Sequence, residues 1–235
     1  MGEGVVVADH VATRIVRPSR FHDDAVLAPA LRRWGGMRMS CAYSLYEYLV
    51  VAVVLQNTTV RRSTQMLAAL FERFGTRMRF DGHELDCFWT PQALLRASEA
   101  DLRRLKVGYR AKSLLRIAAS LAEQEVRESA LRGVAREVAH QELLRLYGVG
   151  PASVWYVLAD VFHHYDAFDV ISPWEQKIYS RILFKRELVP AQQILRTVKR
   201  RWGRWRMLAS HYLFEDLFWR RKQRRIEWLE DLIRA

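Results

Sequence analysis

The sequence predicts an all-α protein, on the strength of three observations. Apolar residues recur every three or four positions along most of the 235-residue chain, which is the pattern of helices with one buried face. Serine, proline and glycine stand where such helices would begin and end, and signals for strands are nearly absent. Half of the residues are hydrophobic and 11% are aromatic, so the chain can bury a substantial core.

The first part of the chain is expected to contain three helices. Residues 1–20 alternate loosely between apolar and polar and predict a short strand or an arm. A helix over 23–34 is followed by a glycine pair, and one over 43–55 is apolar on nearly every side, which predicts a central buried helix. The amphipathic helix over 59–74 has Gly75 as its C-cap.

The rest of the chain is expected to be helical after one loop. Residues 76–90 are expected to be irregular, and Pro91 opens a short helix. Ser98 and Asp101 have the spacing of a capping box, in which each side chain binds the backbone N–H of the other residue. Further helices are expected over 109–125, 136–147, 173–185, 190–202, 204–219 and 221–233.

Residues 143–178 contain the stretch on which the prediction of function depends. The turn Gly148-Val149-Gly150 separates two helices, and the second opens at Pro151 with apolar residues on one face. Glycine lets backbone approach a ligand where a side chain would collide. Because the start of a helix combines unpaired N–H groups with a positive dipole end, it binds anions, and phosphate is the usual one.

The charge balance favours a polyanionic partner. The net charge is +12 and the pI is near 10.1. A basic surface binds nucleic acid by neutralising phosphates and releasing counterions. The alternative is a solvated basic surface on an unrelated protein, since charge alone does not define a partner.

The sequence offers little for a metal, a disulfide framework or a membrane. Its two cysteines, Cys41 and Cys87, are too few for a four-cysteine iron–sulfur cluster or zinc site. The adjacent His163 and His164 would point different ways on a helix, and no carboxylate has matching spacing. The N-terminus lacks the features of a signal peptide, and the longest apolar run, residues 49–55, is far too short for a membrane span. We therefore expect an intracellular protein that has no iron–sulfur cluster, no metal held by side chains and no membrane partner.

Two polar stretches suit nucleic-acid recognition. Gln56, Asn57 and Arg62 follow the apolar segment 43–55, and their amide and guanidinium groups can bind base edges or phosphate. The alternative is a polar turn between helices in which Gln56 caps backbone groups.

The second stretch places an aromatic residue and cations at a helix start. Gly108 precedes Tyr109, Arg110 and Lys112. An aromatic side chain at a loop tip can wedge between bases while the helix N-terminus holds phosphate. The alternative is that Tyr109 is a hydrophobic staple and Lys112 is solvated.

Taken together, five segments in this order resemble the helix-hairpin-helix-GPD (HhH-GPD) superfamily of base-excision DNA glycosylases. They are LQNTT, VGYRAKSL, YGVGPAS, DVISPWEQKIYSRIL and RWGRWRMLASHYLF. The resemblance spans roughly residues 40–220. It implies a two-lobed helical fold, with residues 38–165 as a central lobe that contains the hairpin and residues 1–37 and 166–235 as a lobe of terminal helices. It also implies a monomer that binds double-stranded DNA across the cleft and extrudes the target base, because a stacked base cannot be reached at its glycosidic bond.

The resemblance assigns roles to individual residues. The first two segments look most like the 8-oxoguanine glycosylase branch, in which an asparagine and two arginines read the cytosine opposite the lesion. Asn57, Arg62 and Arg110 match these positions, Tyr109 matches the wedge, and Gln56 matches the residue that fills the gap of the missing base. Lys112 is expected near phosphate. The hairpin, with its residues Gly148, Val149, Gly150, Ala152 and Ser153, would bind phosphate through backbone N–H groups, with a monovalent cation on turn carbonyls and no other cofactor.

Two positions depart from the family at its catalytic residues. Ala152 stands where bifunctional members carry a lysine nucleophile, so lysine-dependent lyase activity is not expected. Ser172 stands where the family has an essential aspartate, and with Glu175 it forms a capping box. Asp169 is the candidate replacement, with Asp166 and Glu175 as alternatives. The competing interpretation of Asp169 is a loop aspartate in an Asx-turn.

Several aromatic residues are candidates for the base pocket, because aromatic faces stack on an extruded base. Tyr156, Trp174 and Phe214 are the main candidates, with Trp155 beside them; helical spacing also fits all four to the core. The later segment DVISPWEQKIYSRIL looks more like the endonuclease III and 3-methyladenine glycosylase branches.

These observations predict a monofunctional DNA N-glycosylase that excises a damaged base from duplex DNA. An oxidised or alkylated guanine opposite cytosine is the expected lesion. The main alternative is a catalytically inactive relative that senses lesions without cutting, and a third is an interaction protein that reuses the helical fold. Either DNA-binding role implies the cytoplasm, with its nucleoid, or the nucleus.

Overall fold

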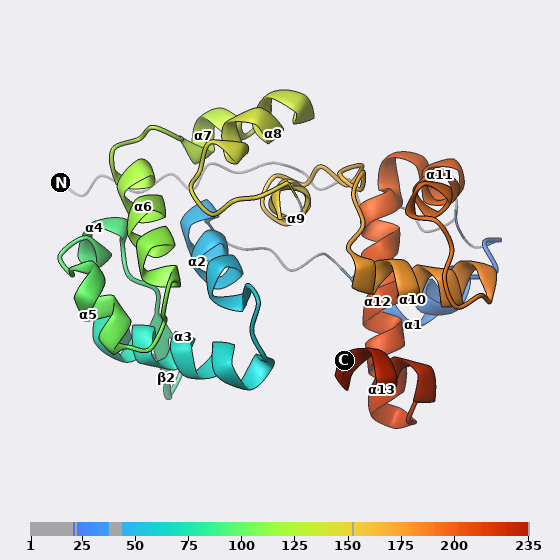
Figure 1. Ribbon diagram of the computed structural model, residues 1–235, viewed down its shortest axis with the longest axis horizontal. Helices are drawn as coiled ribbons and strands as arrows, with labels where there is room; N and C mark the ends of the chain where they lie inside the picture. Colours follow the sequence, from blue (N-terminus) through green and yellow to red (C-terminus); the bar gives the residue numbers. More distant parts are fainter. Residues whose placement is uncertain (1–20, 22, 38–43, 152, 235) are drawn as a thin grey trace. The chain divides into compact units, whose positions relative to one another are not determined.

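The computed structural model describes residue 21 and residues 23–37, 44–151 and 153–234. These residues form helices and one two-stranded sheet (Figure 1). The predicted all-α class is confirmed, with the small sheet as an addition. The strand or arm expected in residues 1–20 lies outside the described residues.

Most helices lie where the sequence predicts them, with small shifts at their ends. The first helix begins at residue 28 and not at residue 23. The boundary between the last two helices lies a few residues later in the chain than expected. The helices are α1 (Ala28–Trp34), α2 (Leu45–Leu55), α3 (Val60–Phe74), α4 (Pro91–Leu94), α5 (Glu99–Arg104), α6 (Arg110–Ala122), α7 (Glu128–Leu131), α8 (Arg136–Leu144), α9 (Val154–Asp160), α10 (Pro173–Phe184), α11 (Ala191–Trp202), α12 (Arg206–Gln223) and α13 (Glu227–Arg234), with a 3-10 turn, η2 (Gly203–Trp205).

The chain divides into two compact units. The terminal unit combines Met1–Arg38 with Ala209–Ala235, and the central unit is Met39–Leu208. The sequence predicted the lobe boundaries after residues 37 and 165. The first boundary agrees to within one residue with that of the structure. The second differs, because residues 166–208 were assigned to the terminal lobe and belong to the central unit of the structure.

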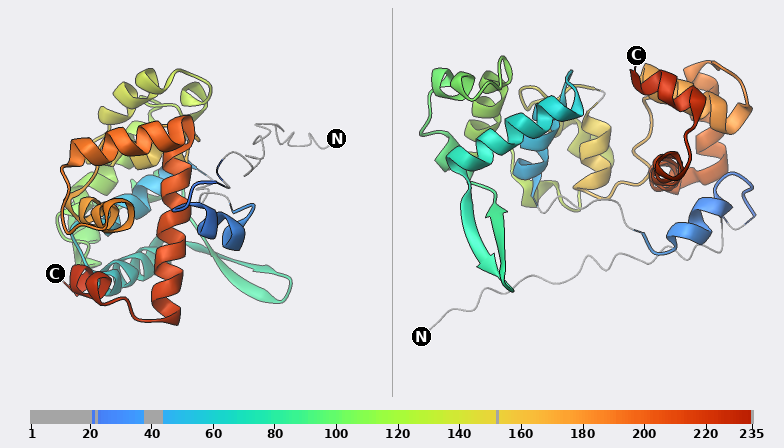
Figure 2. Two further views of the ribbon diagram at one scale, coloured as in Figure 1. Left: turned by 90° about the vertical axis from the view of Figure 1, so that its right-hand side faces the viewer. Right: turned by 90° about the horizontal axis from the view of Figure 1, so that it is seen from below.

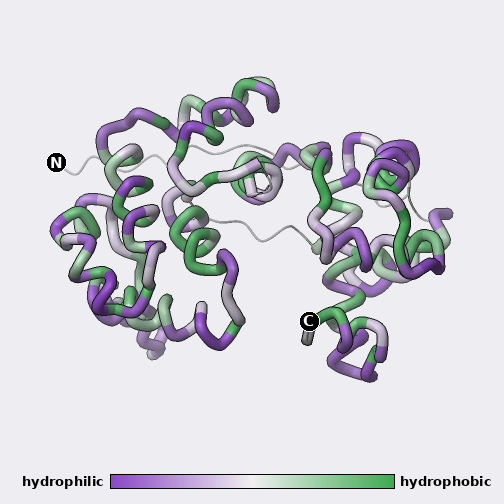
Figure 3. The backbone as a smooth tube through the Cα atoms, viewed as in Figure 1, coloured by the Kyte–Doolittle hydropathy of each residue, from purple (hydrophilic) through white to green (hydrophobic). Residues whose placement is uncertain are grey.

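Helix α2 lies in the core of the central unit. Leu45, Leu49, Val50, Val53 and Val54 are all buried, and hydrophobic residues dominate the helix along its length (Figure 3). It packs against α3, α6 and α9. The predicted central buried helix is therefore confirmed, and it begins where the Ser44 hydroxyl accepts a hydrogen bond from the Glu47 N–H at 3.2 Å.

Residues 76–87 form an antiparallel hairpin of β1 (Thr76–Phe80) and β2 (His83–Cys87), so the prediction of an irregular loop was wrong here. Asp81 and Gly82 make the two-residue turn with φ of 47° and 77°. Such a turn matches the twist of the strands. The hairpin projects from the end of α3 (Figure 2), and all of its residues except Cys87 are exposed.

In the terminal unit, α1 packs against α12 through its last turn. Arg33 pairs with Asp216 and lies over the ring of Trp219 at 4.5 Å. Trp34 meets Trp219 edge to face, with ring centroids 5.8 Å apart.

Candidate nucleic-acid interface

The turn between α8 and α9 exposes one of its glycines. Gly148 is exposed, Val149 is buried, and Gly150 is intermediate. Gly148 has φ of 87°, and a Cβ added there would lie 3.3 Å from the Cβ of Ser113. This position therefore requires glycine both for its backbone conformation and for the space beside α6.

Several backbone groups of this turn already have partners within the chain. The Val149 N–H donates to the Leu146 carbonyl at 3.0 Å, and the Gly150 N–H donates to Ser153 Oγ at 3.0 Å. The Gly150 carbonyl accepts from the N–H groups of Ser153 and Val154. This leaves little acceptor capacity on Gly150 for a cation, so the expected monovalent cation stays a prediction. Ala152 lies outside the described residues.

Cationic side chains of α6 lie beside the turn. Lys112 Nζ lies 5.6 Å and the Arg116 guanidinium 4.4 Å from the ring centroid of Tyr147. Tyr147, Lys112 and Arg116 are all exposed. The glycine turn thus lies at a basic surface, as phosphate binding requires.

Gln56 joins the first polar stretch to the glycine turn. Its side-chain Nε2 donates to the Gly148 carbonyl at 3.0 Å. Asn57, next in the chain, is exposed and has φ of 46°. The sequence analysis gave backbone capping as one interpretation of Gln56, and this contact fits it. The capped group, the Gly148 carbonyl, belongs to a distant turn and not to the adjacent helix.

The second polar stretch is tied to the first by two arginines. Arg110 is buried, and its guanidinium donates to the carbonyl groups of Val53 at 3.2 Å and of Gln56. Arg62 Nη2 donates to the Lys106 carbonyl at 2.7 Å. Tyr109 is 55% exposed at the tip of the turn. The structure therefore brings these predicted residues together, and it gives Arg110 a structural role at the end of α2.

Ser172 caps α10 as predicted. Its Oγ accepts from the Glu175 N–H at 3.2 Å, and Glu175 Oε2 accepts from the Ser172 N–H at 3.0 Å. The capping boxes predicted for Ser172 and Ser98 are both confirmed.

Asp169 lies between two arginines. Arg136 Nη1 and Arg206 Nη2 each donate to its carboxylate at 2.9 Å. Arg136 also donates to the Asp166 carbonyl at 3.0 Å. Each carboxylate oxygen of Asp169 is therefore bound to an arginine side chain, so its negative charge is already compensated within the chain.

Among the described residues, Glu175 is bound by a tyrosine and a backbone N–H and not by a cation. Tyr156 OH donates to Glu175 Oε1 at 2.6 Å, which links α9 to the start of α10. Glu175 is 8% exposed, whereas Tyr156 and Trp174 are 39% and 37% exposed. A buried carboxylate is therefore bound by Tyr156, one of the aromatic residues predicted for the base pocket, and Trp174 precedes Glu175 in the first turn of α10.

A second tyrosine–carboxylate pair, which the sequence did not reveal, lies next to the first. Tyr48 OH donates to Asp160 Oδ2 at 2.7 Å. Burial raises the pKa of Asp160 to about 6, and the hydrogen bond from Tyr48 opposes this shift. Burial, followed by the charge of Glu175, raises the pKa of Tyr156, and Asp160 adds to that shift. Tyr156 and Asp160 are one helical turn apart, so the sequence alone could have indicated that their side chains lie on the same helix face. Tyr48 is 112 positions from Asp160, and no local pattern connects the two.

Two other predicted pocket residues contact different aromatic partners. Trp155 is half-buried against His140, with ring centroids 4.5 Å apart. Phe214 belongs to the terminal unit and neighbours Phe218 at 6.3 Å. Of the residues predicted for the base pocket, Tyr156 is the one with a hydrogen bond to Glu175.

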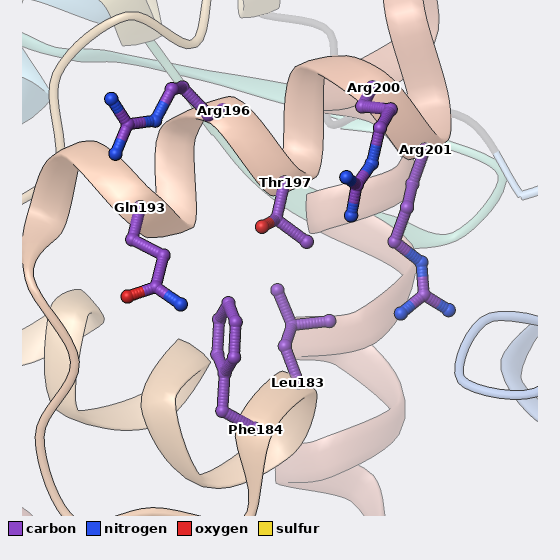
Figure 4. Close-up of a pocket in the computed structure, with 7 residues that line it drawn as sticks. All are labelled: Leu183, Phe184, Gln193, Arg196, Thr197, Arg200 and Arg201. Atoms are coloured by element: carbon purple, nitrogen blue, oxygen red, sulfur yellow. The ribbon is translucent and has the colours of Figure 1, made fainter.

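A separate pocket of about 630 Å³ lies between α10 and α11. Leu183 and Phe184 of α10 point toward Thr197 of α11 (Figure 4). Its lining also includes Arg196, Arg200 and Arg201, the last two from the basic C-terminal region of the sequence. This arginine-lined surface adds to the positive charge of the central unit.

The described part of the chain has no cluster of metal ligands and no membrane-spanning helix. There, no three His, Cys, Asp or Glu side chains are grouped so that they could hold a metal ion. No helix in that part is both long and apolar enough to cross a membrane.

Curated relatives are DNA glycosylases of low sequence identity. The DNA-3-methyladenine glycosylase of Bacillus subtilis is 23% identical over 197 residues, which cover 83% of this chain and 64% of that protein. The probable N-glycosylase/DNA lyase of Methanothermobacter thermautotrophicus is 26% identical over 182 residues, covering 69% of this chain and 57% of the relative. The chain thus spans less than two thirds of the length of either relative.

Solved structures share the fold. The Clostridium acetobutylicum 8-oxoguanine glycosylase/lyase, in complex with double-stranded DNA containing cytosine opposite 8-oxoG, matches with a TM-score of 0.71 and 20% identity over 88% of this chain and 69% of that one. The 3-methyladenine DNA-glycosylase from Archaeoglobus fulgidus gives a TM-score of 0.70 and 23% identity over 83% and 67%. The model of the family described as "HhH-GPD superfamily base excision DNA repair protein" matches residues 50–231, which is more than half of the sequence. The chain therefore belongs to the HhH-GPD superfamily of base excision DNA repair proteins.

Proposed function

We propose that this protein is a DNA glycosylase that hydrolyses the bond between a damaged base and its deoxyribose in duplex DNA. The observation that carries the proposal is the Tyr156–Glu175 hydrogen bond of 2.6 Å. It fixes a buried carboxylate to the exposed aromatic side chain of Tyr156, and the exposed Trp174 is the residue before Glu175 on α10. Aromatic faces suit an extruded base, and a carboxylate suits the positive charge that develops on the sugar.

Glu175 is the carboxylate that we assign to the reaction. Each carboxylate oxygen accepts one hydrogen bond, from Tyr156 OH and from the Ser172 N–H, so each retains capacity for another. Glu175 lies in the first turn of the 12-residue helix α10, at the positive end of the helix dipole. Asp169, the sequence-based candidate, has both oxygens bound to arginine.

The hydrolysis needs one water molecule and one proton acceptor. The water oxygen bonds to C1′ of the deoxyribose as the bond from C1′ to the base nitrogen breaks. The base leaves with the electron pair of that bond, and the proton lost by the water passes to Glu175. The negative charge of Glu175 also stabilises the oxocarbenium-like sugar before the water attacks. Tyr156 keeps the carboxylate oriented throughout.

We propose no lysine-dependent lyase step. Ala152 has no amine that could attack C1′ and form a Schiff base. The product would therefore be an intact strand with an abasic site, which breaks only on treatment with alkali.

DNA binding is proposed through the glycine turn and the two polar stretches. Lys112 and Arg116 supply positive charge beside the turn, and Tyr109 is exposed as a wedge would be. Asn57 and Arg62 are the candidates to read a cytosine opposite the lesion, which favours a damaged guanine. The structure of the Clostridium acetobutylicum relative contains DNA with cytosine opposite 8-oxoG, which supports the proposal.

Duplexes that carry single modified bases test the function. The wild-type protein is incubated with each duplex, treated with alkali and analysed for strand breaks, and a gel shift measures binding. Breaks that appear only after alkali support a monofunctional glycosylase. Binding without breaks would favour the alternative of a lesion sensor, and the absence of binding at low salt would favour an interaction protein.

A further inference from the structure

We propose that the pocket between α10 and α11 is a docking site for an acidic peptide segment of a partner protein, and that one apolar side chain of the peptide enters the pocket. The pocket has a volume of about 630 Å³, within the range of about 300–1,000 Å³ that is usual for ligand pockets. Its lining residues lie in α10 and α11, outside the glycine turn and the two polar stretches. The docking site thus consists of other residues than those to which DNA binding is assigned.

Apolar side chains form one wall of the pocket. Leu183 and Phe184 are the last two residues of α10, and both are only partly buried. Gln193 and Thr197 of α11 point toward them across the pocket (Figure 4). An apolar side chain that binds against this wall removes apolar surface from water. The amide of Gln193 and the hydroxyl of Thr197 can hydrogen-bond to peptide backbone, so the pocket has groups for both a side chain and the backbone that carries it.

The other lining residues are arginines, Arg196, Arg200 and Arg201. Helix α11, with the sequence AQQILRTVKRRW, carries four basic residues and no acidic one. Arg196 and Arg200 are exposed, and among the residues that the structure describes neither is paired with a carboxylate. A guanidinium group binds a carboxylate through two parallel hydrogen bonds. The pocket is therefore complementary in charge to carboxylates that flank an apolar side chain.

The two helices that form the pocket are fixed to each other at their connection. Gln176 Nε2 donates to the Val189 carbonyl at 2.8 Å, and the Val189 N–H donates to Ser180 Oγ at 2.9 Å. Ser180 is fully buried, and its hydroxyl donates to the Gln176 carbonyl at 2.7 Å. Because these hydrogen bonds hold the start of α11 against α10, the pocket is formed before a ligand binds, which lowers the entropic cost of binding.

The apolar wall favours a peptide over the DNA backbone as the ligand. Phosphate contacts in protein–DNA complexes come from cationic and polar side chains and from backbone N–H groups. The sugar–phosphate backbone has no apolar side chain that would fill the space between Leu183 and Thr197. An acidic peptide supplies both parts, the carboxylates for the arginines and the apolar side chain for the pocket. Protein–protein interfaces commonly combine a buried apolar anchor with arginine in this way.

The test measures the binding of fluorescein-labelled peptides to the full-length protein by fluorescence anisotropy. Each of four peptides has one apolar residue, Phe, Trp, Leu or Ile, between two runs of three acidic residues. A reference peptide has serine in place of the apolar residue. We expect at least one of the four peptides to bind, and the serine peptide to bind at least about tenfold more weakly, because serine buries little apolar surface in the pocket.

Two pairs of substitutions distinguish the pocket from the general basic charge. Arg196→Ala with Arg200→Ala removes two cations of the pocket and is expected to weaken peptide binding about tenfold. Lys199→Ala with Arg204→Ala is the matched control, because it removes two exposed cations outside the pocket lining, and is expected to weaken binding less than about threefold. Thr197→Phe keeps every cation and fills the pocket, so it is expected to remove the advantage of the apolar peptides over the serine peptide.

Circular dichroism verifies that each variant is folded, and a gel shift measures its affinity for duplex DNA. The inference is overturned if none of the four peptides binds, if the serine peptide binds as tightly as the others, or if the two pairs of substitutions weaken peptide binding equally. A loss of duplex affinity of about tenfold in Arg196→Ala with Arg200→Ala, without such a loss in the control pair, would also overturn it, because the pocket arginines would then contact DNA.

Discussion

The side-chain amide of Gln56 donates to the carbonyl oxygen of Gly148 at 3.0 Å, which connects the turn after α2 to the glycine turn before α9. These two turns carry the residues expected to contact DNA. The hydrogen bond fixes one turn relative to the other, so a single interaction between residues 92 positions apart positions both parts of the candidate interface.

Replacing Gln56 by alanine is expected to weaken DNA binding and excision about tenfold. The loss of one hydrogen bond costs about 1 kcal/mol of stability, so the protein remains folded while the two turns lose their connection. A gel-shift titration measures the binding. Gln141→Ala on α8, at an exposed position, is the matched control and is expected to bind as the wild type does. Equal binding by both variants would contradict the role of the connection.

Replacing Gly148 by alanine is expected to destabilise the protein by about 1–3 kcal/mol. The backbone has φ of 87°, and the new Cβ would lie 3.3 Å from the Ser113 Cβ. Gly150→Ala provides the control, because a Cβ there meets nothing within 4 Å and its φ is not in the left-handed region. Urea unfolding followed by circular dichroism measures both. A smaller loss of stability for Gly148→Ala than for Gly150→Ala would show that the turn has another conformation.

Asp160 is expected to make stability depend on pH. Burial raises its pKa from an ordinary value of 3.8 to about 6. Between these values the folded chain holds a proton that the unfolded chain has released, so the free energy of unfolding falls as pH rises through the interval. The shift corresponds to a loss on the order of 2–3 kcal/mol above pH 6.

Asp160→Asn is therefore expected to be more stable than the wild type at pH 7.5 and of similar stability at pH 4. Thermal unfolding at both pH values measures the difference. Asp231→Asn, at an exposed position of α13, is the control and should change the unfolding temperature little at either pH. An Asp160→Asn variant that is less stable by the same amount at both pH values would contradict the burial of an ionised carboxylate.

The hairpin of β1 and β2 is expected to unfold locally when Gly82 is replaced by valine. Gly82 has φ of 77° in the two-residue turn, and a β-branched residue is strained there. Amide hydrogen exchange of Met78 and Leu85, which pair across the strands at a hydrogen-bonded position of the ladder, should become fast while α2 remains protected. Loss of protection in α2 as well would mean that the hairpin supports the core.

The sequence predicted those features that depend on neighbouring residues. The helix positions, the glycine turn and the capping box of Ser172 and Glu175 all follow from periodicity or from contacts within four residues. The turn Asp81-Gly82 also depends only on neighbouring residues, because an Asp-Gly pair between two strands favours a hairpin. The sequence analysis missed it because the flanking strands are short and polar.

The proposed excision site depends on contacts between distant residues, so the sequence supplied candidates for it but could not decide among them. Asp169 has its arginines 33 and 37 positions away, and Glu175 meets Tyr156 from 19 positions away. The sequence offered three carboxylates in one loop and helix start. Their different partners, arginine for Asp169 and tyrosine for Glu175, distinguish them only in the folded chain.

The central claim is that Glu175, bound by Tyr156, is the carboxylate that supports excision. Single-turnover excision on the best duplex of the panel, with strand breaks revealed by alkali, compares the wild type with Glu175→Gln and Asp169→Asn. Both replacements keep the shape of the side chain and remove its charge, and a gel shift verifies DNA binding. We predict that Glu175→Gln binds the duplex and loses at least a hundredfold in rate, and that Asp169→Asn retains excision within about tenfold. Full activity in Glu175→Gln, with activity lost in Asp169→Asn, would contradict the account.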